Sequence, residues 1–218
     1  TPRREVVAAL AAGNSVSLTG PPGAGKTTLG TVIGRSWPGE RVFWYTILPG
    51  LNDSLGALLF ALAHFTHEHG RSALWSYLLT HSGEAIDTAQ ATGLLRADLG
   101  TIGVPAPLLI IDEVDLLRTA DGEARSAAHS QLLFFLEALV GMAPLLLIGQ
   151  RAYVDTPVHL SLPALDETGV ADLLDAAGAH LPHSQAQQVY NVTGGLPRLV
   201  WLVIALLRSG EDVDEITR

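Results

Sequence analysis

Nine consecutive residues have the types and the spacing of a loop that binds phosphate. They match the pattern G-x-x-x-x-G-K-[ST] at every defined position, and they are Gly20, Pro21, Pro22, Gly23, Ala24, Gly25, Lys26, Thr27 and Thr28. Glycines let the backbone bend so that successive N–H groups point inward and form an anion-binding concavity. We expect Lys26 to reach the β- and γ-phosphates of a nucleotide, and the Thr27 hydroxyl to bind Mg²⁺.

The residues on either side of this loop support the match. Residues 15–19 (SVSLT) are typical of a short strand, and residues 27–36 are typical of a helix that ends at 37–39 (WPG). A strand, a glycine-rich loop and a helix in this order are what the motif requires, because the helix N-terminus adds partial positive charge at the phosphates. The sequence therefore predicts a nucleotide-binding site rather than a chance glycine-rich turn.

A pair of carboxylates, Asp112 and Glu113, follows the apolar run 108–111 (LLII). Such a run suits a strand that is buried on both faces of a parallel sheet. We expect Asp112 to hold the Mg²⁺ water shell beside Thr27, and Glu113 to polarise a water that attacks the γ-phosphate. The alternative is an acidic loop after a core strand. ATP is favoured over GTP, because neither D-x-x-G nor N-K-x-D occurs where guanine-specific proteins carry them.

Gln150 and Arg151 follow another buried run, 145–148 (LLLI). If that strand lies between the first and the third strand, both side chains are expected to reach the γ-phosphate region. A guanidinium there could read whether the third phosphate is present. The alternative is an arginine in a solvated loop.

The run 193–198 (TGGLPR) opens the last long helix predicted from the sequence. The two glycines allow a tight approach, and Pro197 suits the first helical turn. We expect Pro197 to contact the base or the ribose of the nucleotide and Arg198 to reach phosphate. The alternative is an ordinary turn between two helices.

The pattern of elements predicts two parts, an α/β domain over residues 1–163 and a helical lid over residues 164–218. Strands are expected over 15–19, 41–47, 108–111, 145–148 and 158–162. Helices are expected over 1–12, 27–36, 54–68, two pieces of 71–103 with a break near Ser82 and Gly83, 127–140, 166–177, 184–193 and 197–207.

The composition excludes several classes of protein. A net charge of −9 argues against electrostatic binding of nucleic acid. The absence of cysteine excludes disulfides and thiolate metal sites, and it fits a reducing cytoplasm. The longest apolar run, 199–207, is too short to span a membrane. The chain starts at Thr1 without a methionine, so we expect it to be a piece of a larger protein.

Together these residues resemble the STAND class of AAA-like ATPases, which includes the NB-ARC and NACHT signalling modules. The resemblance is carried by 20–28 (GPPGAGKTT), 108–113 (LLIIDE), 145–151 (LLLIGQR), the L-x-L-x-x-L run over 160–165, and 195–197 (GLP). It implies a P-loop three-layer α/β fold with a five-stranded parallel sheet in the order 5-1-4-3-2, followed by the lid.

The resemblance also implies a switch that is controlled by ATP and ADP, with Mg²⁺ and with slow, regulatory hydrolysis. ADP would hold the lid closed, and ATP would release it for self-association, with sensor and effector domains outside this chain. By this resemblance Arg151 is the sensor arginine and Pro197 is the lid proline.

An AAA+ ATPase that remodels nucleic acid or protein complexes is the second possibility, of the helicase-loader or transposition-helper type. In that group Arg198 would be the sensor arginine of the lid. Only residues 150–157 separate the last two predicted strands, too few for the helix that carries an arginine finger in such motors, and this favours the STAND class. Gln150 counts against the STAND class, because STAND members often have Thr or Ser at this position. A nucleotide-binding scaffold without useful hydrolysis is a third possibility.

Overall fold

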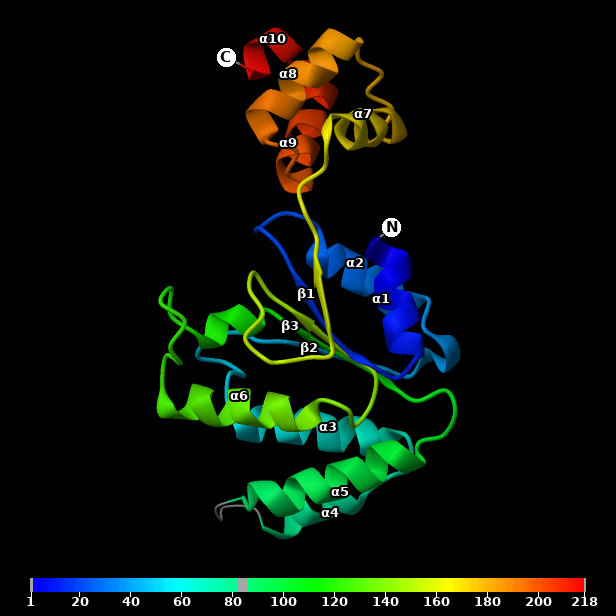
Figure 1. The fold of residues 1–218 in the computed structure, drawn as a ribbon, viewed down its shortest axis with the longest axis vertical. Helices are drawn as coiled ribbons and strands as arrows, with labels where there is room; N and C mark the ends of the chain where they lie inside the picture. The colour runs from blue at the N-terminus through cyan, green and yellow to red at the C-terminus, as the bar shows by residue number, and fades with distance from the viewer. Residues whose placement is uncertain (1, 82–85, 218) are drawn as a thin grey trace. The chain divides into compact units, whose positions relative to one another are not determined.

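The computed structural model describes residues 2–81 and 86–217, and its chain forms two compact units (Figure 1). The larger unit contains the chain up to Thr19 and from Thr27 to Leu160. The smaller unit contains the C-terminal segment from Ser161 together with the phosphate loop, Gly20–Lys26. The helix break predicted near Ser82 and Gly83 lies outside the described residues.

A five-stranded sheet forms the centre of the larger unit. Its strands are β1 (Ser15–Thr19), β2 (Val42–Thr46), β3 (Leu108–Asp112), β4 (Leu145–Ile148) and β5 (Val158–Ser161). They lie in the order β2-β3-β4-β1-β5, which confirms the predicted order. The register of the parallel pairs places Ser15 beside Leu145, Leu145 beside Leu109, and Leu109 beside Phe43.

This register brings the carboxyl ends of β1, β3 and β4 to one edge of the sheet. β3 and β4 are buried along their whole length, as their continuous apolar runs predict. β5 alternates between half-buried and exposed residues, because it is an edge strand. The residues that follow β1, β3 and β4 are the ones for which the sequence predicts chemistry.

Helices cover both faces of the sheet and complete a three-layer fold (Figure 1). They are α1 (Pro2–Ala11), α2 (Lys26–Arg35), α3 (Leu55–Glu68), α4 (Ala73–Thr80), α5 (Thr88–Thr101) and α6 (Ala127–Leu139). Figure 1 shows α1 and α2 on one side of the sheet, α3 and α6 on the other, and α4 and α5 beyond α3. Two 3-10 turns were not predicted: η1 (Pro38–Glu40) and η2 (Val114–Leu117).

A large apolar cluster of the larger unit lies between the sheet and the α3–α6 layer. Phe43, Leu109 and Leu145 from the strands pack in one buried cluster with Leu62 of α3 and Phe135 of α6. Burial of large apolar side chains is the main stabilising contribution, at roughly 1.5–3 kcal/mol for each. This packing holds the ends of β3 and β4 rigidly in place.

The smaller unit is helical, with α7 (Glu167–Ala176), α8 (His183–Thr193), α9 (Pro197–Arg208) and α10 (Val213–Ile216). Its own apolar cluster includes Val170, Val189 and Val200. The three predicted helices are present as α7, α8 and α9. The short α10 was not predicted, because it is only four residues long and carries almost no periodic signal. Its one sequence signal is the N-cap Asp212, whose side chain accepts the N–H of Asp214.

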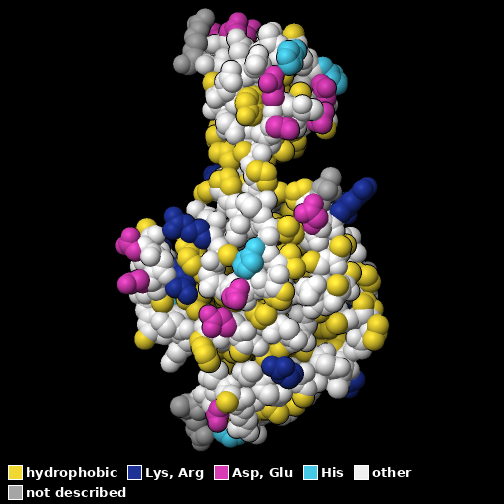
Figure 2. Space-filling view, viewed as in Figure 1, with side chains coloured by type: hydrophobic (Ala, Val, Ile, Leu, Met, Phe, Trp, Pro, Cys, Tyr) yellow, Lys and Arg dark blue, Asp and Glu magenta, His cyan; other side chains and the backbone are white. Residues whose placement is uncertain are grey.

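The surface of the larger unit carries charges of both signs. On the face shown in Figure 2, Lys and Arg side chains occur in separate groups with Asp and Glu side chains between them. They form no continuous basic stripe on that face. None of the described helices is long and apolar enough to cross a membrane.

Candidate nucleotide-binding site

The phosphate loop depends on glycine for its close contacts. Gly20 has φ +147°, and a Cβ there would lie 2.3 Å from the carbonyl oxygen of Leu162. Lys26 begins α2, and its Nζ donates to the carbonyl oxygens of Gly20 and Pro21 at 2.9 and 3.0 Å. The ammonium is therefore held over the loop's own backbone, where phosphate oxygens would compete for it.

The start of α9 contacts the same loop. The backbone N–H of Arg198 donates to the carbonyl oxygen of Gly23 at 3.2 Å. A Cβ at Gly23, which has φ +83°, would lie 3.1 Å from Cβ of Arg198, so only glycine admits this approach without a shift. Pro197 is the first residue of α9, as predicted for a proline in a first helical turn.

The turn before α9 is fixed on its other side by the start of the helical segment. Leu165 donates its N–H to the carbonyl oxygen of Gly195 at 2.8 Å. Gly195 has φ +70°, and a Cβ there would lie 1.9 Å from the carbonyl oxygen of Leu165. Of the two glycines for which a tight approach was predicted, only Gly195 makes one, because a Cβ at Gly194 would meet no atom within 4 Å. The contact at Gly195 links the beginning of the segment to the beginning of α9.

The carboxylate pair follows β3 as the sequence predicts. Asp112 is the last residue of β3 and is only 2% exposed, and its Oδ1 accepts the N–H of Glu113 at 2.9 Å. Glu113 is half-buried and has φ 62° and ψ 35°, a left-handed conformation. It is the only described non-glycine residue with positive φ. Such a conformation costs about 1–3 kcal/mol and is found preferentially at functional sites.

From the sequence, Gln150 and Arg151 are expected to reach the γ-phosphate region if the strand before them lies between the first and the third strand. In the structure, β4 does lie between β1 and β3. Gly149 donates its N–H to the carbonyl oxygen of Leu18 at 3.2 Å. Gln150 is exposed, and its N–H donates to Oδ1 of Asp115 at 2.9 Å. Arg151 is exposed, and its Nη1 donates to the carbonyl oxygen of Ala120 at 3.2 Å. The guanidinium of Arg151 is thus directed to the loop after η2.

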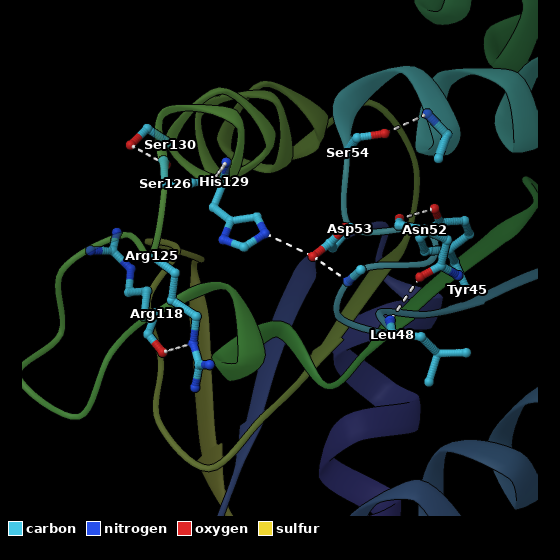
Figure 3. Close-up of polar contacts among 12 residues, drawn as sticks. Tyr45, Leu48, Asn52, Asp53, Ser54, Arg118, Arg125, Ser126, His129 and Ser130 are labelled. Carbon is cyan, nitrogen blue, oxygen red and sulfur yellow. Dashed lines mark hydrogen bonds and ion pairs between the residues drawn. The ribbon is translucent and has the colours of Figure 1, made fainter.

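That loop, residues 118–125, is organised by its own arginines (Figure 3). Arg118 donates from Nη1 to the carbonyl oxygen of Gly122 at 2.6 Å, and its guanidinium lies 5.1 Å from the centre of the Tyr153 ring. Arg125 donates from Nε to the carbonyl oxygen of Arg118 at 2.8 Å. These bonds fix the loop that accepts the bond from the arginine after β4.

A carboxylate–imidazole pair joins the loop after β2 to the start of α6 (Figure 3). Oδ2 of Asp53 accepts the N–H of Gly50 at 2.8 Å and lies 2.9 Å from Nε2 of His129. The N–H of Gly50 and then His129 hold the pKa of Asp53 below its usual value. The stabilising effect of this carboxylate is therefore present above the ordinary pKa of aspartate and is lost as the pH falls. Sequence reasoning missed this pair, because its members lie 76 positions apart.

Tyr45 provides a prediction for alkaline pH. Its hydroxyl donates to the carbonyl oxygen of Asn52, and burial, with a smaller effect of Asp53, raises its pKa from 10.0 to about 12. The folded chain therefore favours the neutral phenol, and this contribution is complete below pH 10 and is lost as the pH rises toward 12. We expect the wild-type free energy of unfolding to fall by roughly 2–3 kcal/mol more than that of Tyr45→Phe over this range. Urea unfolding of both chains between pH 8 and 12 measures this difference, and parallel curves would refute it.

Comparison with known proteins places this chain in a family and a fold. The family model described as "AAA domain" matches residues 11–156. Among solved structures, a Signal Transduction ATPase with Numerous Domains (STAND) protein with a tetratricopeptide repeat sensor, from Pyrococcus horikoshii, is similar with a TM-score of 0.70 and 17% identity. AMPPCP-bound DnaA from Aquifex aeolicus is similar with a TM-score of 0.53 and 13% identity. A comparison with curated protein sequences finds no match.

The coverage of these similarities is uneven. The STAND structure covers 99% of this chain, and this chain spans 31% of the STAND protein. For DnaA the two shares are 96% and 60%. At these identities the similarity concerns the fold, which agrees with the resemblance to the STAND class that the sequence motifs indicate.

Proposed function

The chain belongs to the AAA domain family, and from that premise we propose that it is the nucleotide-controlled switch of a STAND-type signalling protein. ATP and ADP bind at the phosphate loop, and hydrolysis is slow and serves regulation. ADP holds residues 164–218 as a closed lid over the domain of residues 1–163, and exchange for ATP releases the lid so that chains associate. Sensor and effector domains belong to the longer protein.

The observation that carries this proposal is the hydrogen bond from Arg198 to Gly23. The N–H groups of the loop are the donors that a nucleotide's phosphates require, so a change of nucleotide changes the loop backbone. A single hydrogen bond joins that backbone to the first turn of α9. A lid that begins there can respond to the phosphates without any intervening element.

Catalytic roles follow from the chemistry of phosphoryl transfer. Glu113 orients the attacking water, and Lys26 neutralises charge that develops on the β- and γ-oxygens. Arg151 and Gln150 respond to the third phosphate. Pro197 and Arg198 contribute the lid's contacts with the nucleotide.

The residues proposed for Mg²⁺ fit that ion. Mg²⁺ prefers oxygen ligands and keeps several waters, and it is usually bound through one or two carboxylates together with substrate phosphates. The hydroxyl of Thr27 and the carboxylate of Asp112 supply such oxygens, and Asp112 is held firmly at the end of a buried strand. When bound, the ion neutralises phosphate charge during hydrolysis.

The second candidate is an AAA+ ATPase that remodels nucleic acid or protein complexes, and the fold similarity to DnaA favours it. Two observations weigh against it. Residues 149–157, all described, contain no helix between β4 and β5 that could carry an arginine finger. The chain is acidic overall, and the face in Figure 2 carries acidic side chains between its basic groups.

Retained nucleotide and turnover separate these candidates. We expect the purified chain to retain ADP and to hydrolyse ATP more slowly than about 0.01 s⁻¹, against a median of roughly 10 s⁻¹ for enzymes. Double-stranded DNA is expected to leave this rate unchanged. Rapid turnover that DNA stimulates would support the remodelling ATPase and overturn the switch, and bound nucleotide without any hydrolysis would support a scaffold.

Pro197→Ala tests the lid. Pro197 presets the backbone of the first turn of α9, which holds Arg198 against Gly23. We expect ADP to dissociate several-fold faster from this variant, because the first turn becomes less ordered. Stopped-flow release of a fluorescent ADP analogue measures the rate. Pro182→Ala, which changes the residue before α8, is the matched control and should release ADP like wild type. An unaltered rate in Pro197→Ala would leave this proline as a turn residue only.

A further inference from the structure

We propose that Asp115 is a positioning residue that couples the segment after β4 to the carboxylate of Glu113. The inference rests on the proposed function, because it gives Asp115 a part in the hydrolysis assigned to Glu113. Asp115 lies two residues after Glu113, inside the 3-10 turn η2. Its side chain contacts the N–H of Gln150, one of the two residues that are proposed to respond to the third phosphate.

The hydrogen bonds of Asp115 connect three parts of the site. Its Oδ1 accepts the N–H of Gln150 at 2.9 Å, and its backbone carbonyl oxygen accepts the N–H of Arg118 at 3.1 Å. The turn itself is closed by the N–H of Leu116, which donates to the carbonyl oxygen of Glu113 at 3.0 Å. A carboxylate that accepts a backbone N–H forms a charge-assisted bond, stronger than one between neutral groups. The half-buried Asp115 is therefore a fixed link between these segments.

Gly149 supplies an independent observation for this link. It is buried, and its φ is not in the left-handed region, so backbone conformation does not explain the glycine. A Cβ there would lie 2.9 Å from Oδ1 of Asp115 and 3.3 Å from the carbonyl oxygen of Arg151. Any larger residue would push the carboxylate away from its partner N–H. Glycine at position 149 therefore leaves room for the carboxylate of Asp115 beside the N–H of Gln150.

The other hydrogen bonds of the segment after β4 show which parts of the chain the link at Asp115 connects. On one side Gly149 is bound to Leu18 of β1, the strand that leads into the phosphate loop. On the other side Arg151 is bound to Ala120. Asp115 forms the hydrogen bond that joins this segment to the turn that begins at Glu113. A displacement of the segment by the third phosphate is thereby passed over two residues to Glu113.

This arrangement assigns Asp115 an effect on the rate of hydrolysis and not on the binding of ADP. We expect Asp115→Ala to lower kcat for ATP about tenfold or more, similar to the loss when a residue that orients a metal ligand is removed. The Kd for ADP and the KM for ATP should stay within about threefold of wild type. Asp115→Asn should recover most of the rate, because its amide oxygen can still accept the N–H of Gln150.

A double-mutant cycle with Gly149→Ala makes the test specific. Gly149→Ala should lower kcat in the same way, and adding Asp115→Ala to it should cost much less than Asp115→Ala alone, since the bond is already broken. Single-turnover hydrolysis and ADP titration of the four chains and of Asp115→Asn supply the data, with thermal unfolding to show that each chain is folded.

Each outcome decides the inference. Wild-type-like kcat in Asp115→Ala, additive effects in the cycle, no recovery in Asp115→Asn, or an equal loss of ADP affinity and rate would each overturn it, while the proposed function would stand. A wild-type chain that binds or hydrolyses no ATP would overturn the proposed function and this inference with it.

Discussion

Lys26→Ala is expected to abolish nucleotide binding while the fold is retained. In the folded chain Nζ of Lys26 lies within hydrogen-bonding distance of two carbonyl oxygens of the loop, so the cation is already placed where phosphates bind. Its removal takes away the cation that the loop itself holds against the phosphates. We expect the Kd for ATP and for ADP to rise at least about 100-fold, which corresponds to roughly 2.8 kcal/mol. Titration with a fluorescent nucleotide measures both constants.

Arg35→Ala is the matched control, because it removes a cation from the last turn of the same helix, α2. Its affinity for nucleotide should equal that of wild type. Lys26 is also the only lysine in the sequence, so its reaction with an acylating reagent can be followed at one site by mass spectrometry. Bound ATP should protect it. Unchanged affinity in Lys26→Ala, or acylation that ATP does not slow, would overturn the assignment of the loop.

Glu113→Gln is expected to bind ATP like wild type and to hydrolyse it at least about 100-fold more slowly, the lower end of the range for loss of a general base. The amide keeps the shape of the side chain but cannot accept a proton from water. Glu123→Gln is the control, because it removes an exposed carboxylate from the loop 118–125. Binding is measured with a nucleotide analogue and hydrolysis in single turnovers. A normal rate in Glu113→Gln would remove Glu113 as the residue that activates water.

The left-handed backbone conformation of Glu113 allows a second test at the same residue. Glycine adopts this conformation without strain, so Glu113→Gly should lose hydrolysis and yet be no less stable than wild type, with a gain of about 1 kcal/mol at most. Glu113→Ala should lose hydrolysis and keep the strain. Thermal unfolding of the two variants compares them, and equal stability would show that the backbone conformation costs nothing here.

Much of the fold could be predicted because its signals are local. The continuous apolar runs of β3 and β4 predict buried strands, and the phosphate-binding pattern predicts the strand, loop and helix around Lys26. The strand order came from the resemblance to the STAND class, and it is confirmed. α10 was missed because four residues give no usable period.

The partners within the site could not be predicted, because they depend on contacts between distant segments. The acceptor for the N–H of Gln150 is a side chain 35 positions away, and a backbone donor carries no sequence signal. The bond from Arg151 to Ala120 depends on the shape of a loop that two other arginines organise. The left-handed conformation of Glu113 contradicts its residue type, and only tertiary structure can impose it.

We propose that this chain senses which nucleotide is bound and does not drive steady work. The most direct measurement compares, in one preparation, the rate at which ADP dissociates with the rate of single-turnover ATP hydrolysis. The switch predicts that ADP release is the slower step, so that the chain rests in the ADP state until exchange is triggered. ADP release much faster than hydrolysis, with no retained nucleotide, would contradict the account.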